Sequence, residues 1–184
     1  MSEEKTIENL QESFNHSMSD LNIRLEQQMK KAFFDKLHQD FKKNPPDTNH
    51  ISICIHELYE SLCKFVPSKQ EIHLQIKKDL IHQNVNLDTM PFIVNGLINW
   101  IEAFQAPFHD IKTKQWRLDF KQCKDYADFL RDFFESYYNH IEVVYKESWE
   151  ARKRLVQGEN IVPPQYRQVV KGNNGIPDVM KSGL

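Results

Sequence analysis

The sequence predicts an all-α protein: a helical bundle with two long helical arms and an extended C-terminal tail. Apolar residues recur at steps of three and four over most of the chain, as they do on one face of an α-helix. Only five of the 184 residues are glycine, and the eight prolines gather in a few places between the periodic stretches. A chain with so few turn signals is typical of helices rather than of sheets.

Length, charge and cysteine content indicate what kind of protein this is. A chain of 184 residues buries roughly 70% of its unfolded surface, enough for a core without disulfides or metal. A net charge of −2 with 27% charged residues lacks the positive excess that binding to a phosphate backbone needs, so nucleic acid is not expected. Three cysteines, an odd number, fit a reducing compartment. No signal region and no run of roughly 18 apolar residues is present, so we expect a soluble, intracellular, cytoplasmic protein without a membrane span.

The first region, residues 1–44, is predicted to be one long helix over about residues 4–43. Its apolar positions are Ile7, Leu10, Phe14, Met18, Leu21, Leu25, Met29, Phe33, Leu37 and Phe41. Over its first half this stripe is narrow and nearly heptad, which is typical of a seam against one partner helix. Two interpretations stay open: the stripe packs on the chain's own bundle, or it binds a protein partner or a second copy. Pro45 and Pro46 end the helix.

The second region, residues 47–157, is predicted to be the bundle core. A helix over about residues 48–65, capped by Asp47 or Thr48, precedes a helix over about residues 68–83 that starts at a Ser68/Glu71 capping box.

A third helix of this region, over about residues 89–106, has Asp88 as its expected N-cap and Pro91 in its first turn. It is apolar over most of its circumference, so it should lie at the centre of the bundle. Residues 110–124 are expected to form a short helix with loops.

The second long arm is predicted over about residues 125–157, ending at Gly158 as a C-cap candidate. Residues 158–184 carry two prolines in a row and a Gly-Asn-Asn-Gly segment, and they show no sustained period. We expect them to be an extended or disordered tail.

The central stretch, residues 56–110, resembles the T-complex protein 11 family. Three segments carry the resemblance: Leu58 to Pro67 (LYESLCKFVP), Asp79 to Gln83 (DLIHQ) and Ala106 to Asp110 (APFHD). The likeness could continue to residue 157. The family pattern has Cys before Ala-Pro and Arg before the Asp, where this chain has Gln105 and His109, and the chain is shorter than a full family domain.

The resemblance implies a non-enzymatic helical regulator. Members of the family are linked to cyclic-AMP and protein-kinase-A signalling and to sperm function. We carry over the class of helical interaction protein and not the pathway.

The sequence carries no catalytic motif, so no catalytic residue, cofactor or enzyme activity is expected. It has no phosphate-binding glycine loop, nucleophile elbow or His-Glu-x-x-His helix. His50, Cys54 and His56 are close in sequence but do not share one helix face, so no metal site is expected.

Partner binding is the most specific functional prediction. Tyr137 and Tyr138 are adjacent, so both cannot face one core, and one of them should lie at a second interface. The candidate partner-binding residues are Tyr138, Tyr145, Trp149, Tyr166 and Arg167. The basic residues near the end of the last helix leave weak contact with an anionic surface open.

Two functions are compatible with these features. The first is a protein–protein interaction protein, either a scaffold or a regulatory adaptor. The alternative is a structural component of a macromolecular assembly such as a virion, because a composition rich in Asn, Lys, Ile and Phe suits an AT-rich genome.

Overall fold

A computed structural model describes residues 2–157. Within that range the chain forms six α-helices and one short 3-10 helix, and no strand. The elements are α1 (Ser2–Phe41), α2 (Asn49–Cys63), α3 (Gln70–Leu80), α4 (Met90–Phe104), η1 (Pro107–His109), α5 (Asp110–Gln122) and α6 (Tyr126–Val156). The all-α prediction is confirmed. The tail from residue 158, with the predicted C-cap Gly158, lies outside the described residues.

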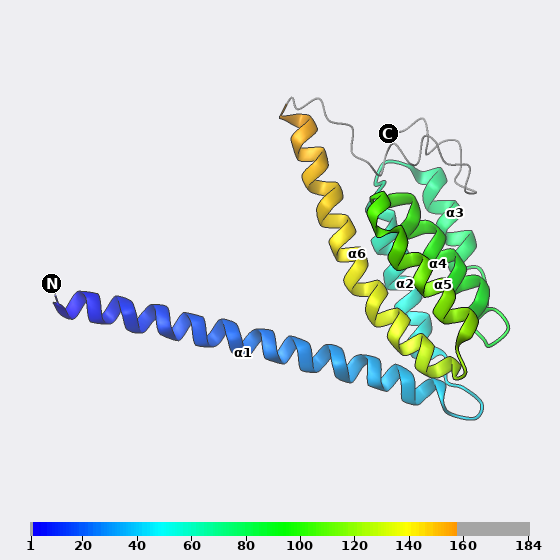
Figure 1. The fold of residues 1–184 in the computed structure, drawn as a ribbon, viewed down its shortest axis with the longest axis horizontal. Helices are drawn as coiled ribbons and strands as arrows, with labels where there is room; N and C mark the ends of the chain where they lie inside the picture. Colours follow the sequence, from blue (N-terminus) through cyan, green and yellow to red (C-terminus); the bar gives the residue numbers. More distant parts are fainter. Residues whose placement is uncertain (1, 158–184) are drawn as a thin grey trace.

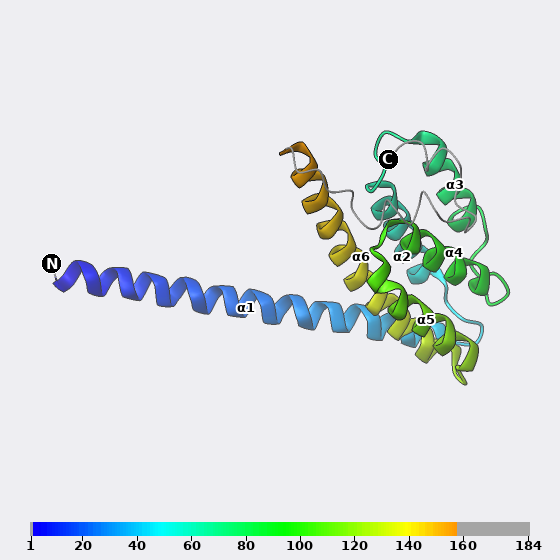
Figure 2. The ribbon, with the colours of Figure 1, turned by 45° about the horizontal axis from the view of Figure 1, so that its top comes forward.

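Helices α2 to α6 pack together, and α1 projects from them as a straight rod (Figure 1). A second view, turned about the horizontal axis, shows the same separation of α1 from the bundle (Figure 2). Only the last turns of α1 join the core, through Phe34, Leu37 and Phe41, which are all buried. Every residue from Ser2 to Ala32 is exposed. The rod and the bundle therefore meet at one end of α1.

Helix α4 lies at the centre of the bundle, as its apolar circumference predicts. Nine of its 15 residues are buried, among them Leu97 and Ile101 with no exposed surface. Gly96 lets α3 come close, because a Cβ at this position would lie 3.1 Å from Leu80 Cδ2. Phe92 is an exception to the expected core and is 65% exposed.

Helix α6 is long, as predicted, and it packs on the bundle over most of its length, within the region predicted to be the bundle core. Ten of its residues, from Ala127 to Ser148, are buried. Tyr137 is fully buried and its hydroxyl donates to Leu97 O at 2.7 Å. Aromatic side chains supply much of this buried face, and their burial holds the helix against α1, α2, α4 and α5. Beyond Ser148 the helix has no buried residue.

The helix starts are only partly as predicted. The last long helix begins where expected, and Asp125 is its N-cap, with Oδ1 accepting from Ala127 N at 2.9 Å and Asp128 N at 3.2 Å. The Ser68 capping box does not form: Lys69 is the N-cap of α3, without a side-chain bond. Lys69 N is tied to Val66 O at 3.1 Å in the preceding turn, so the helix begins one residue later.

Of two further caps, the one of α4 differs in position from the expectation and the one of α2 agrees with it. The N-cap of α4 is Thr89 rather than Asp88, because Asn86 Oδ1 accepts from both Asp88 N and Thr89 N and folds the loop back on itself. Thr48 occupies the N-cap of α2 without a side-chain bond, while Asp47 Oδ1 accepts from Asn49 N at 3.1 Å.

Residues 110–122 form one continuous helix, α5, instead of a short helix with loops. Trp116 anchors it: the indole ring is buried and its Nε1 donates to Ser136 Oγ at 3.1 Å. Phe120 of the same helix packs against Phe129, with the ring centroids 5.0 Å apart, so two aromatic side chains hold a helix whose surface is mostly polar.

Candidate protein-binding surface

The projecting part of α1 carries a stripe of exposed apolar side chains. We call it the exposed α1 stripe, and its members are Ile7, Leu10, Phe14, Met18, Leu21, Leu25 and Met29, which are 42–72% exposed. At about 100° per residue these seven positions fall within roughly 100° of the helix circumference. They extend over roughly 33 Å of helix. Monomeric proteins rarely leave such a continuous apolar surface in water.

The exposed α1 stripe faces away from the bundle. At about 100° per residue, the face of α1 that buries Phe34, Leu37 and Phe41 lies roughly 160° around the helix from the centre of the stripe. Ile23, the other exposed apolar residue of the rod, lies on the bundle-facing side, 51% exposed. A helix that packs on the stripe would therefore meet no obstruction from the bundle.

A pocket of about 290 Å³ opens where α1 leaves the bundle, between α1 and α6. Its apolar walls come from Met29, Phe33, Phe34 and Tyr138. Met29 belongs to both the pocket and the exposed α1 stripe, so the two form one continuous apolar surface.

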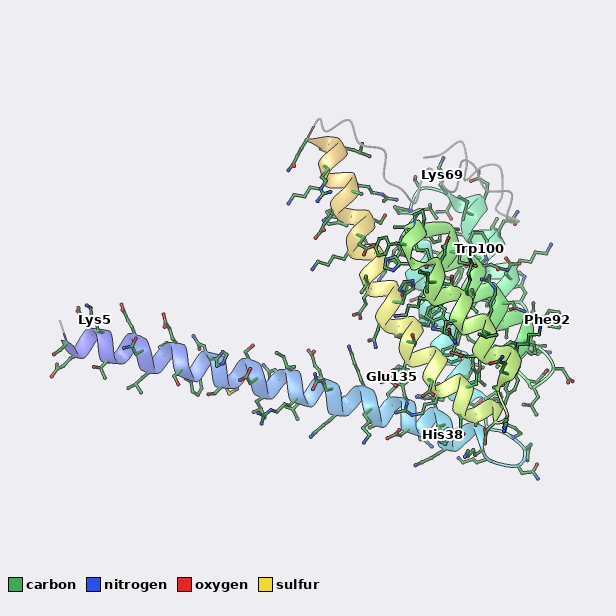
Figure 3. All side chains as sticks on the ribbon, viewed as in Figure 1. Lys5, His38, Lys69, Phe92, Trp100 and Glu135 are labelled. Atoms are coloured by element: carbon green, nitrogen blue, oxygen red, sulfur yellow. The ribbon has the colours of Figure 1, made fainter. Side chains whose placement is uncertain are left out.

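The junction of α1 with α6 is held by charge as well as by packing. His38 Nε2 lies 2.5 Å from Asp128 Oδ1, and Arg131 Nε lies 3.1 Å from Asp35 Oδ1. The hydrogen bond from His38 lowers the pKa of Asp128. Both pairs join the last turns of α1 to the start of α6, and Figure 3 labels His38 at this end of the rod.

The predicted partner-binding residues have different surroundings. Tyr138 is packed inside the chain: its hydroxyl donates to Glu57 Oε2 at 2.8 Å, and its ring lies 5.8 Å from that of Phe34. Burial raises its pKa well above the ordinary tyrosine value. The second interface predicted from the Tyr137–Tyr138 pair is thus occupied by α1 and α2, with one edge of the Tyr138 ring lining the pocket.

Tyr145 and Trp149 lie one turn apart near the free end of α6, 41% and 61% exposed. The Tyr145 ring also contacts Phe65 edge-on, with the centroids 5.4 Å apart. A role of Tyr145 and Trp149 in partner binding remains a prediction. Tyr166 and Arg167 lie outside the described residues.

A buried polar network joins α4, α5 and α6 where the chain departs from the family pattern. Gln105 has no exposed surface; its Nε2 donates to Asp110 Oδ1 at 2.9 Å and its Oε1 lies 2.8 Å from His140 Nε2. His109 lies beside this group, 2.9 Å from Glu147 Oε2. Nothing in the sequence signalled this contact, since Gln105 and His140 are separated by two helices. The network satisfies the buried polar atoms and is a structural feature.

Other groups of polar side chains in residues 2–157 have structural roles. A pocket of about 520 Å³ between α5 and α6 has several Asp residues at its rim, but Asp125 is used as the helix cap and Asp128 binds His38. Among residues 2–157 no three His, Cys, Asp or Glu side chains are grouped as metal ligands. Cys54, Cys63 and Cys123 are free thiols, and burial raises the pKa of Cys54 to about 11, which makes it a poor nucleophile.

None of the helices in the described range has the length and apolar character needed to cross a bilayer.

Fold and surface define a class: an all-α protein that presents an unpaired amphipathic helix beside a bundle. The family model for T-complex protein 11 matches residues 8–136, well over half of the chain. The chain belongs to the T-complex protein 11 family. The match is wider than residues 56–110 and takes in most of the exposed α1 stripe. Searches of curated proteins and of solved structures found no match to this chain.

Proposed function

We propose that this protein is a non-enzymatic interaction protein, a helical scaffold or regulatory adaptor that binds protein partners through the exposed α1 stripe. One observation carries the proposal: seven apolar side chains along roughly 33 Å of helix are exposed and lie on the side away from the bundle. Burying such a stripe against an apolar groove or a second helix is a common mode of protein recognition.

Two further features support the same class. Family membership favours it, because the T-complex protein 11 resemblance implies helical regulators rather than enzymes. The polar clusters of the bundle also favour it, since their side chains are bonded to one another in the interior and leave no converging nucleophile and base.

The test is a comparison of three forms of the chain in cells of its source. Leu21→Glu places a charge at the middle of the exposed α1 stripe, and Ile23→Glu is the matched control because it makes the same kind of change on the opposite side of α1. Each form carries an affinity tag that distinguishes it from resident copies, and proteins that co-purify are quantified by mass spectrometry.

We expect the wild type and Ile23→Glu to retain the same protein in stoichiometric amount and Leu21→Glu to lose it. Identical sets from all three forms would show that the exposed α1 stripe is not the binding surface.

A further inference from the structure

We infer that the occupant of the exposed α1 stripe is a second copy of this chain, paired antiparallel with the first through residues 7–29. This inference deepens the proposed function and rests on it, since it names the partner of the same surface. Three observations carry it: the spacing of the stripe, the distribution of charge along α1, and the side of α1 on which the stripe lies.

The stripe is nearly symmetric about its own middle. An antiparallel pair centred close to Met18 sets Leu10 opposite Leu25 and Phe14 opposite Leu21, so apolar side chains meet along the whole seam. The spacing from Ile7 to Met29 runs 3, 4, 4, 3, 4, 4, which is an 11-residue repeat. Such a repeat drifts by only about 20° per 11 residues around an α-helix, so a pair needs no more than a slight right-handed supercoil. The rod of α1 in Figure 1 is nearly straight, which is close to that form.

Charge along α1 favours the antiparallel orientation. Residues 2–11 hold three carboxylates, Glu3, Glu4 and Glu8, and one cation, Lys5. Residues 24–33 hold three cations, Arg24, Lys30 and Lys31, and one carboxylate, Glu26. The antiparallel register sets these two segments side by side at both ends of the seam. A parallel pair would instead place like charges together at each end, which destabilises helix pairs.

The bundle leaves room for this partner. Because the stripe lies roughly 160° from the bundle-facing side of α1, the second α1 packs on the free side along its full length. The register brings Ile7 of the second copy next to Met29, at the mouth of the apolar pocket. The two bundles then lie at opposite ends of the helix pair, about 45 Å apart along it.

The first measurement is the molar mass of the purified full-length chain by sedimentation over a range of concentrations. We expect a dimer for the wild type and for Ile23→Glu. In Leu21→Glu each dimer would bury two carboxylates in the seam, so the dissociation constant should rise by roughly 100-fold or more. A monomeric wild type up to submillimolar concentration, or equal dimerisation of Leu21→Glu and Ile23→Glu, would overturn the inference.

The second measurement fixes orientation by disulfide trapping. Leu10→Cys and Leu25→Cys are made separately, with different tags, in a background with Cys63→Ser and Cys123→Ser; Cys54 stays because it has no exposed surface. On mild oxidation the antiparallel register predicts cross-linked heterodimers from the mixture and little cross-linking of either variant alone. Equal or stronger cross-linking of Leu10→Cys with itself would show a parallel pair and overturn the register.

The two proposals fail in different ways. If the purified wild type is monomeric while Leu21→Glu loses a different protein in cells, the inference of a self-pair is wrong and the proposed function holds. If Leu21→Glu changes neither the mass nor the set of captured proteins, both are wrong.

Discussion

His140 lies buried in the bundle against Gln105, His109 and Trp116. Because Gln105 Oε1 is an acceptor, His140 Nε2 carries a proton. Burial, with smaller contributions from His109 and Lys112, lowers the pKa of His140 from 6.5 to about 4. The folded state therefore binds fewer protons at this position than the unfolded chain does.

This pKa shift predicts a loss of stability in acid. A group with a lowered pKa stabilises the fold above its unfolded value and loses that contribution as the pH falls, here between 6.5 and about 4. The loss should reach about 2–3 kcal/mol of unfolding free energy. Urea unfolding followed by circular dichroism across this range measures it. His140→Gln should give a flatter pH dependence than the wild type, and equal slopes would contradict the assignment.

Tyr137 supplies a second prediction at the scale of one side chain. Its hydroxyl donates to Leu97 O inside the core at 2.7 Å, at full burial. Tyr137→Phe keeps the ring packing and removes that bond, so the unfolding free energy should fall by about 1 kcal/mol. Tyr138→Phe is the control, because its hydroxyl bonds to Glu57 near the surface and should cost less. A larger loss for Tyr138→Phe than for Tyr137→Phe would contradict the structure.

Two helices begin after similar cap residues in the sequence, but only one of these residues caps its helix in the structure. Asp125 and Ser68 both precede helical patterns, yet only Asp125 bonds to the first turn of its helix. Asp125→Ala should therefore cost about 1 kcal/mol of unfolding free energy, and Ser68→Ala less than about 0.5 kcal/mol. Chemical denaturation of the two variants tests this. Equal costs would mean that Ser68 caps α3 after all.

The elements also show what periodicity could and could not predict. Spacing alone located every long α-helix to within a few residues, because an apolar face of period 3.6 needs no knowledge of its partner, but it missed the extent of α5. It could not show that α1 leaves the bundle while α6 packs along it, since both helices are long and striped. The difference lies in which side of each helix contacts the bundle, and this depends on tertiary packing. The Gln105–His140 contact was equally hidden, because it joins residues from separate helices and repeats at no spacing.

The residues of the candidate binding surface could be predicted from the sequence, but their exposure could not. The stripe from Ile7 to Met29 could be listed, and its pairing with a partner helix was one of two interpretations. The structure was needed to show that it lies outside the bundle, while the continuation through Phe33, Leu37 and Phe41 runs into it. The residues chosen from sequence emphasised tyrosines of α6, of which Tyr138 is engaged inside the chain.

For the whole molecule, the division into rod and bundle predicts that the bundle folds without the rod. Residues 2–29 contribute no buried side chain to the bundle. Their removal should leave the melting temperature unchanged when wild type and truncated chain are compared at concentrations where both are monomeric. Thermal unfolding by circular dichroism is the measurement. A marked, concentration-independent fall in the melting temperature would mean that the rod packs on the bundle in solution.

The stability of the projecting part of α1 as a helix depends on burial of its apolar stripe. Most helical stability in proteins comes from packing of an apolar face, and an isolated helix in water is marginal unless it is long and rich in alanine. Residues 2–32 contain Ala32 as their sole alanine and several Ser and Asn residues, which are poorer helix formers. A bound partner should therefore stabilise the helix as well as bury the stripe.

Amide hydrogen exchange over residues 7–29 tests most directly whether a partner covers this stripe. The account predicts that protection in this segment rises with protein concentration, stays in Ile23→Glu and is lost in Leu21→Glu, while protection of α4 is the same in all three forms. Exchange in residues 7–29 that is independent of concentration and equal in the three forms would contradict the claim that a second copy covers the exposed α1 stripe.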